Sequence, residues 1–190
     1  PGTNRMSRSA NASAALLEAF AERDIRFVPG ARPTGLDGAR VTYDDGSVLP
    51  YDVFLGVPKH RAPEVVLESG LAEDGYLPVD SATLRTGIDG VYAIGDVATV
   101  GVPKAGVFAE GAGRVVAREI VAGIRGETDP EPYDGIGQCY LEFGDGRVGI
   151  VNVDFLSGPT PTGSLTAPSV DLVAEKQRFG SSRRARWFGL

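Results

Sequence analysis

Three short stretches of this 190-residue sequence carry residue types that could do chemistry. The first is Gly95-Asp96-Val97, which follows the apolar run 91–94. An ionised aspartate accepts hydrogen bonds from ligand hydroxyl groups, and a preceding glycine lets a ligand approach the backbone closely. Ligands gather at the carboxyl ends of strands in open α/β sheets. The pattern predicts a ligand contact here, with an ordinary strand that ends in a Gly-Asp turn as the alternative.

The second stretch is Val102-Pro103-Lys104-Ala105-Gly106, at the start of an expected long helix. The unpaired N–H groups and the dipole at a helix start favour a negative charge, and Lys104 adds a positive charge nearby. Such a site would stabilise an anion or the charge that develops on a reduced cofactor. A surface lysine beside a helix start is the alternative.

The third stretch contains Cys139, the only cysteine of the chain. A redox role needs an accessible thiolate and a partner thiol, and no second cysteine is present, so a pair within this chain cannot form. A buried, inert strand cysteine is the alternative.

His60, the only histidine, lies in the loop 58–63. It could relay protons near neutral pH, or it could be an ordinary exposed loop residue.

The low numbers of cysteines and histidines argue against several other kinds of site. One cysteine excludes an internal disulfide and a multi-cysteine metal site, and one histidine argues against a His-rich metal site or a self-contained Ser-His-Asp triad. We therefore expect no metal site. A net charge of −6 without a large basic surface predicts no nucleic acid partner. No apolar run is long enough to span a membrane, and a cytoplasmic, reducing compartment fits best.

The residues 91–98 resemble the second flavin-binding motif of the pyridine nucleotide-disulfide oxidoreductases, whose aspartate binds the ribitol chain of FAD. The segment 102–106 resembles the Pro-Lys-x-Gly segment of sulfide:quinone reductases and of flavocytochrome c sulfide dehydrogenases. In these proteins, a cysteine placed like Cys139 pairs with an earlier cysteine near the flavin, accepts sulfide sulfur and passes electrons to the flavin. The resemblance thus implies a catalytic role for Cys139. The cofactor-binding residues that it implies are Gly95, Asp96, Val97, Lys104, Ala105 and Gly106.

The implied function is an FAD-dependent oxidoreductase that passes electrons from sulfide, through a cysteine pair and FAD, to a quinone. One alternative is a type II NADH:quinone reductase, in which a nicotinamide, NADH or NADPH, is the donor. Another is a non-catalytic domain that folds and self-associates without flavin. An enzyme of the glutathione reductase type is less favoured, because the His-Glu pair of its dimerisation domain is absent after Gly126.

The first flavin motif of such proteins, a Gly-x-Gly-x-x-Gly turn that holds the FAD pyrophosphate, is absent from this sequence. We therefore expect the chain to be the latter part of a longer flavoprotein and to bind FAD weakly or not at all by itself. Faces that the missing part would cover favour self-association. The Arg- and aromatic-rich tail 178–188 predicts peripheral contact with the inner face of the membrane, with a solvated or packed tail as the alternative.

We predict that an α/β fold positions these residues. For this chain taken alone, the expected class is α+β. We interpret residues 1–85 as the end of a second, NAD-like dinucleotide domain with a β-meander. Residues 86–126 would end the FAD-binding domain, and residues 127–190 would form a C-terminal region with a β-hairpin and a terminal helix.

Apolar periodicity predicts helical segments over 11–23, 65–71, 106–124 and 170–179. Alternation and turn signals predict strands over 25–28, 39–43, 47–49, 76–79, 138–143 and 147–154. Two mostly apolar runs, 51–57 and 91–94, are expected to be buried strands. Residues 157–168, rich in Ser, Thr, Gly and Pro, are predicted to form a surface loop.

Overall fold

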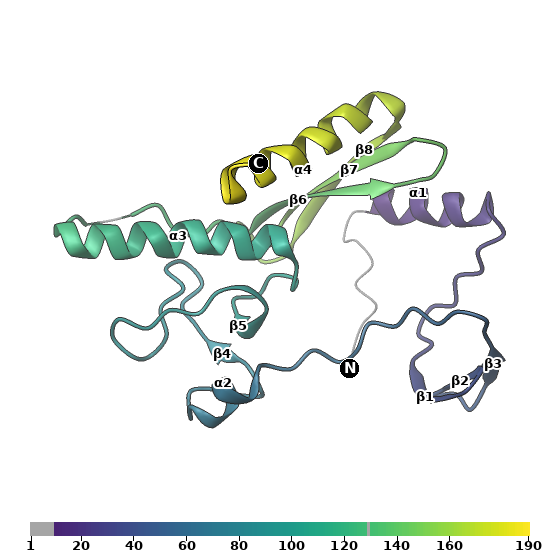
Figure 1. The fold of residues 1–190 in the computed structure, drawn as a ribbon, viewed down its shortest axis with the longest axis horizontal. Coiled ribbons are helices and arrows are strands. Elements are labelled where there is room, and N and C mark those ends of the chain that lie inside the picture. The colour runs from purple at the N-terminus through teal and green to yellow at the C-terminus, as the bar shows by residue number, and fades with distance from the viewer. Residues whose placement is uncertain (1–9, 129) are drawn as a thin grey trace.

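The computed structural model describes residues 10–128 and 130–190 (Figure 1). Its helices are α1 (Ala10–Ala21), α2 (Glu64–Glu68), α3 (Gly106–Arg125) and α4 (Val173–Phe188), with 3-10 turns η1 (Gly95–Val97) and η2 (Val170–Leu172). Its strands are β1 (Pro33–Asp37), β2 (Arg40–Tyr43), β3 (Val48–Pro50), β4 (Leu77–Pro78), β5 (Ala98–Thr99), β6 (Ile136–Glu142), β7 (Val148–Asp154) and β8 (Thr162–Ser169). The predicted α/β class is confirmed, with small sheets in place of one large sheet.

Helix α1 forms where it was predicted, but the strand predicted at 25–28 is absent. Asp24 takes a left-handed conformation with φ 54°, and the N–H of Ile25 bonds back to the carbonyl of Phe20 at 2.9 Å. The end of the helix thus uses the backbone groups that a strand would need. Ile25 and Val28 are each about half exposed.

The meander β1-β2-β3 is an antiparallel sheet that stands apart from the rest of the molecule in Figure 1. The β2–β3 hairpin was predicted, and its register pairs Val41 with Leu49. Strand β1 was not predicted, because its sequence Pro-Thr-Gly-Leu-Asp has weak strand propensity and every residue in it is exposed.

The buried strand predicted at 51–57 is also absent. After the bond from Tyr51 N to Ala39 O, no described segment pairs with this run. Val53 is 76% exposed, Leu55 93% and Val57 86%. An apolar run becomes a buried strand only where neighbouring strands offer backbone partners and cover, which the described residues do not provide here.

The run 91–94 forms no regular strand either. It is held by an isolated bridge between Arg85 and Tyr92 and by the bond from Ala93 N to Leu84 O. The conformation of Gly95, with φ 72°, turns the chain into η1 directly afterwards. The strand that does pair is β5, whose Ala98 lies beside Leu77 of β4 in a short parallel ladder.

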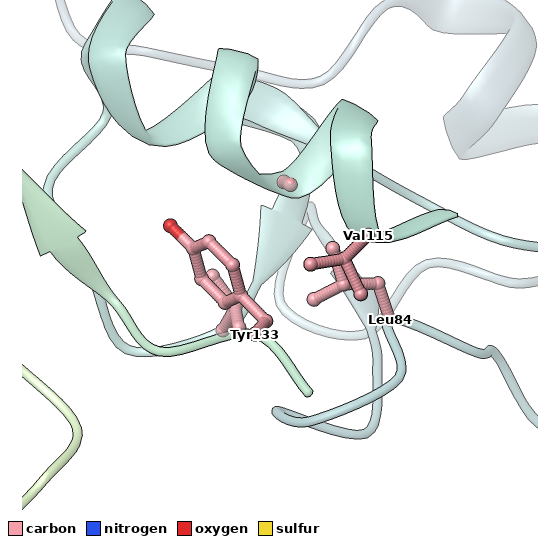
Figure 2. Close-up of a cluster of buried hydrophobic side chains, with 5 residues drawn as sticks. Leu84, Val115 and Tyr133 are labelled. Atoms are coloured by element: carbon pink, nitrogen blue, oxygen red, sulfur yellow. The ribbon is translucent and has the colours of Figure 1, made fainter. Parts of the chain in front are cut away.

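The main core lies beneath helix α3, which ends at a left-handed Gly126 as predicted. Figure 2 shows Val115 of α3 beside Leu84, with the ring of Tyr133 in the same cluster. The hydroxyl of Tyr133 donates to the carbonyl of Phe108 at 3.3 Å, so this buried polar group is satisfied. Burial raises the pKa of Tyr133 to about 12, which keeps it a neutral donor. A second cluster joins β4, β5 and Ala93.

The C-terminal sheet has the antiparallel order β6-β7-β8, and α4 lies along it (Figure 1). The β6–β7 hairpin was predicted, whereas β8 occupies part of the predicted loop 157–168. β8 is an edge strand with mostly exposed residues, so it needs few apolar side chains, and an edge tolerates Pro168, which has no N–H. Helix α4 extends beyond the predicted end at 179 and includes the whole Arg- and aromatic-rich tail 178–188.

Candidate functional site

The Gly95-Asp96 turn presents an unengaged carboxylate. Gly95 needs its left-handed conformation to start η1, which a side chain would strain. Asp96 is exposed in the first turn of η1, and within the described residues its carboxylate makes no hydrogen bond. The Asp96 side chain is therefore available to a ligand. Val97 points elsewhere, because it packs against the second core cluster.

Lys104 is fixed beside this turn. Its Nζ donates to the backbone carbonyl of Asp96 and lies 4.0 Å from the ring centroid of Tyr76. The hydroxyl of Tyr76 donates in turn to the backbone carbonyl of His60 at 2.8 Å. Burial lowers the pKa of Lys104, while the nearby Asp96 charge opposes that shift. The positive charge thus has a defined position, set by a cation–π contact.

His60 contributes its backbone to this arrangement. Its carbonyl accepts the Tyr76 hydrogen bond, while its residue is exposed in the loop before α2. The imidazole makes no hydrogen bond within the part of the chain that the structure describes. A proton-relay role for the ring stays a prediction.

The start of α3 has free backbone donors. Ala105 is extended, and its carbonyl accepts bonds from the N–H groups of Phe108 and Ala109. Among the described residues no side chain caps this end, and the N–H groups of Gly106 and Val107 make no backbone hydrogen bond. These donors and the helix dipole create a positive potential at Ala105 and Gly106.

The turn and the helix start border one small space. Gly95, Asp96, Lys104 and Ala105 line a cavity of only about 10 Å³, enough for roughly one water molecule. Asp96 is exposed and Lys104 is half-buried, so this side of the site faces solvent within the chain. A large ligand would lie across it rather than enter it.

Cys139 lies in a larger groove that reaches the same helix start. The groove has a volume of about 580 Å³, and its walls come from the start of α3, from β6 and from α4. Its lining residues include Ala105, Gly106, Cys139, Phe179, Arg183 and Trp187. Cys139 is half-buried, and burial raises the pKa of its thiol. A redox role would therefore need a partner group that stabilises the thiolate.

Helix α4 forms one wall of the groove and is attached through polar and aromatic contacts. The hydroxyl of Tyr140 donates to Glu175 Oε1 at 3.0 Å, and the rings of Tyr140 and Phe179 lie 5.0 Å apart. Arg183 Nε donates to Glu110 Oε2 at 2.8 Å. Burial alone would raise the pKa of Glu110, but hydrogen bonds from Arg186 and Arg183 outweigh it and hold that pKa below its usual value.

The structure thus brings the predicted residues together around the start of α3. Ala105 lines both the space beside Gly95, Asp96 and Lys104 and the groove that contains Cys139. Sequence reasoning missed Tyr76, Glu110 and Arg183, whose roles come from tertiary contacts. Of the three, only Arg183 had a sequence signal, the cluster of arginines and aromatics near the carboxyl end.

Comparison with known families gives a match over more than half of the chain. The sequence model of the family described as "Pyridine nucleotide-disulphide oxidoreductase" matches residues 4–114, which include Asp96, Lys104 and the start of α3. Cys139 and α4 lie beyond the matched region.

Two curated relatives are similar to parts of the chain. A coenzyme A disulfide reductase of Staphylococcus aureus is 30% identical over 139 residues, covering 68% of this chain and 31% of the relative. The mitochondrial sulfide:quinone oxidoreductase of Mus musculus is 26% identical over 117 residues, covering 60% of this chain and 26% of the relative. The chain thus spans about a third or less of the length of these relatives.

Solved structures show the same fold. A chain in the mitochondrial ATP synthase structure of Tetrahymena thermophila superposes with a TM-score of 0.61 at 25% identity, covering 77% of this chain and 37% of that one. A ferredoxin reductase of Rhodopseudomonas palustris gives a TM-score of 0.56 at 24% identity, covering 78% and 38%. Among residues 10–128 and 130–190, no helix combines the length and apolar character needed to cross a bilayer.

Proposed function

Because the chain belongs to the pyridine nucleotide-disulphide oxidoreductase family, we propose that it forms the flavin-facing end of an FAD-dependent oxidoreductase. Bound FAD would supply a ring that accepts and passes on a pair of electrons. The donor set fits this cofactor: Asp96 offers a free carboxylate to a sugar-like hydroxyl chain, and the start of α3 offers free N–H groups to an electron-rich ring edge.

Lys104 has the most specific role in this proposal. Its ammonium group, held between Asp96 and the Tyr76 ring, adds a fixed positive charge beside the helix start. Preorganised positive potential favours the form of a bound ligand that carries more negative charge. Lys104, Ala105 and Gly106 would therefore favour the reduced cofactor over the oxidised one.

The observation that carries the proposal is the position of Ala105. This residue lines both the space beside Asp96 and Lys104 and the groove that contains Cys139. A ligand lying across the start of α3 would contact the hydroxyl-binding side and the thiol side together. That arrangement suits a cofactor that must exchange electrons with a thiol.

For the whole protein we infer a sulfide:quinone reductase-like reaction. Sulfide would attack a disulfide between Cys139 and a partner cysteine, so that the S–S bond breaks and one cysteine becomes a persulfide while the other leaves as a thiolate. The electron pair would then pass through FAD to a quinone, which takes up two electrons and two protons. The Pro103-Lys104 segment, the position of Cys139 in a groove beside the start of α3 and the name of the mouse relative support this assignment. The partner cysteine would come from a part of the protein outside this chain.

A second candidate is a nicotinamide-dependent reductase. The Staphylococcus relative is named a coenzyme A disulfide reductase, and it aligns over more of this chain than the mouse relative does. In this case NADH or NADPH would be the donor and a disulfide the acceptor. A type II NADH:quinone reductase shares that donor but reduces a quinone, and a flavin-free, self-associating domain stays the non-enzymatic alternative.

We also propose peripheral membrane contact through the end of α4. Trp187 is 55% exposed, Phe188 69% and Leu190 75%, and Arg184 is exposed beside them. Aromatic and arginine side chains of this kind suit the interface between lipid headgroups and water. Arg183 and Arg186 contribute less to such a surface, because both pair with Glu110.

The test uses the complete protein that contains this chain. Its flavin absorbance is recorded without oxygen after addition of sulfide or of NAD(P)H, for the wild type and for Cys139→Ser. The sulfide:quinone proposal predicts bleaching by sulfide that is lost in Cys139→Ser. Bleaching by NAD(P)H alone selects the second candidate, and a purified protein without flavin contradicts both.

A further inference from the structure

Helix α4 lies over the C-terminal sheet without a hydrophobic stripe. None of its residues, all of which the structure describes, is buried. A surface helix normally docks by burying an apolar face, since propensity alone rarely holds a short helix in place. The docking of α4 must therefore depend on polar and aromatic contacts.

These contacts occur at both ends of the helix. Near its start, Glu175 accepts a hydrogen bond from Tyr140, and Lys176 pairs with Glu142. Toward its end, Arg183 and Arg186 both pair with the carboxylate of Glu110 on α3. Each of these interactions includes a charged group, so salt would weaken the docking. The ring contact between Tyr140 and Phe179 is the uncharged addition to them.

Glu110 is the most sheltered member of this set. Its side chain is only 10% exposed, against 69% for Glu142. Arg183 is fixed twice, because its guanidinium also lies 3.5 Å from the ring centroid of Phe179. An ion pair that is shielded from water interacts more strongly than an exposed pair, so Glu110 dominates the attachment of α4.

We propose that α4 is a lid over the groove that contains Cys139, held closed by a latch of Glu110 with Arg183 and Arg186. Phe179, Arg183 and Trp187 of α4 form one wall of this groove. Release of the latch removes that wall and exposes the thiol. The lid controls access to Cys139 and does not depend on the proposed flavin chemistry.

The single cysteine of the chain makes the lid measurable. The alkylation rate of Cys139 is recorded with iodoacetamide, a neutral reagent, across a range of pH, so that the thiolate rate constant is separated from the thiol pKa. In Glu110→Gln, this rate constant is expected to rise at least about fivefold, because a shielded ion pair is lost. The matched control is Glu131→Gln, which breaks the exposed pair with Arg118 on the same helix and should leave the rate unchanged.

Salt gives an independent test. Raising the salt concentration from about 0.01 M to about 1 M shortens the Debye length from about 30 Å to about 3 Å. The alkylation rate of the wild type should rise over this range, and that of Glu110→Gln should rise much less. Equal salt responses in the two proteins would overturn the latch.

A structural defect in Glu110→Gln would be detected separately. Amide hydrogen exchange should accelerate in α4 while β6, β7 and α3 stay protected. If Glu110→Gln unfolds, Arg186→Gln replaces it, since Arg186 is half exposed and its loss should raise the rate by about twofold. Alkylation rates in the folded variant that equal the wild-type rate would refute the lid.

Discussion

At the scale of single residues, the backbone conformation of Gly95 determines where the carboxylate of Asp96 lies. With φ 72°, it directs the chain into η1 and presents Asp96 to solvent. A Cβ at this position would lie 3.5 Å from the Cβ of Ala109, an ordinary contact. The cost of a side chain is therefore backbone strain rather than a steric clash.

This leads to a stability prediction. Gly95→Ala should lower the free energy of unfolding by about 1–2 kcal/mol, the cost of a left-handed non-glycine residue. Urea unfolding measures this change in the free energy of unfolding. Gly87→Ala is the control, since Gly87 has neither a positive φ nor a neighbour within 4 Å of an added Cβ. Equal losses in both variants would argue against the strained turn.

Asp96 and Lys104 form the electrostatic centre of the site. Burial lowers the pKa of Lys104, and the Asp96 charge opposes that shift. Removing the charge in Asp96→Asn should therefore lower the pKa of Lys104 further. An NMR titration of the lysine side chains measures this, with Asp89→Asn as a control that removes a charge beside Arg85 instead. An unchanged or raised pKa of Lys104 in Asp96→Asn would contradict the arrangement.

The sequence predicted these residues because their chemistry is local. A Gly-Asp turn after an apolar run and a lysine before a helix are visible in the chain order. Tyr76 and Glu110 were missed because their importance depends on contacts with distant residues. Tyr76 contacts Lys104, which lies 28 residues later in the chain, and Glu110 pairs with Arg183. Side-chain type alone does not reveal such contacts.

At the scale of elements, local signals predicted α1, α3 and the two hairpins well. Helical periodicity and Asp-Gly turns are properties of short segments, and the structure confirms them. The buried strands predicted at 51–57 and 91–94 were wrong, because a buried strand depends on partner strands from elsewhere in the chain. β8 was missed for the opposite reason, since an edge strand pairs on one side and needs few apolar residues.

The exposed run 51–57 is a surface with consequences for association. Val53, Leu55 and Val57 are spaced like one face of a strand, and all are mostly exposed. Exposed apolar segments with this alternation and without a backbone partner promote pairing between chains. We expect this chain, taken alone, to self-associate with increasing concentration in light scattering.

Leu55→Lys should reduce that association by placing a charge in the run. Leu36→Lys is the matched control, because Leu36 is 56% exposed on β1, which is already paired with β2. A wild-type chain that stays monomeric at every concentration would show that the exposed run has no such effect.

At the scale of the whole molecule, we propose that the chain supplies part of a cofactor site. The cavity beside Asp96 and Lys104 has a volume of only about 10 Å³, and the sequence has no glycine-rich turn for a pyrophosphate. The division into segments 1–85, 86–126 and 127–190 stays a prediction. The chain spans about a third or less of its curated relatives, which agrees with a site completed by further residues.

The most direct test is the flavin content of the complete protein that contains this chain, compared between the wild type and Asp96→Ala. We expect FAD close to one per protein in the wild type and a dissociation constant at least about tenfold larger in Asp96→Ala, because a charge-assisted hydrogen bond is lost. Asp89→Ala, which removes another carboxylate of the same region, should retain the flavin. A wild-type protein without FAD, or equal FAD affinity in all three proteins, would contradict the proposal that this chain faces a flavin.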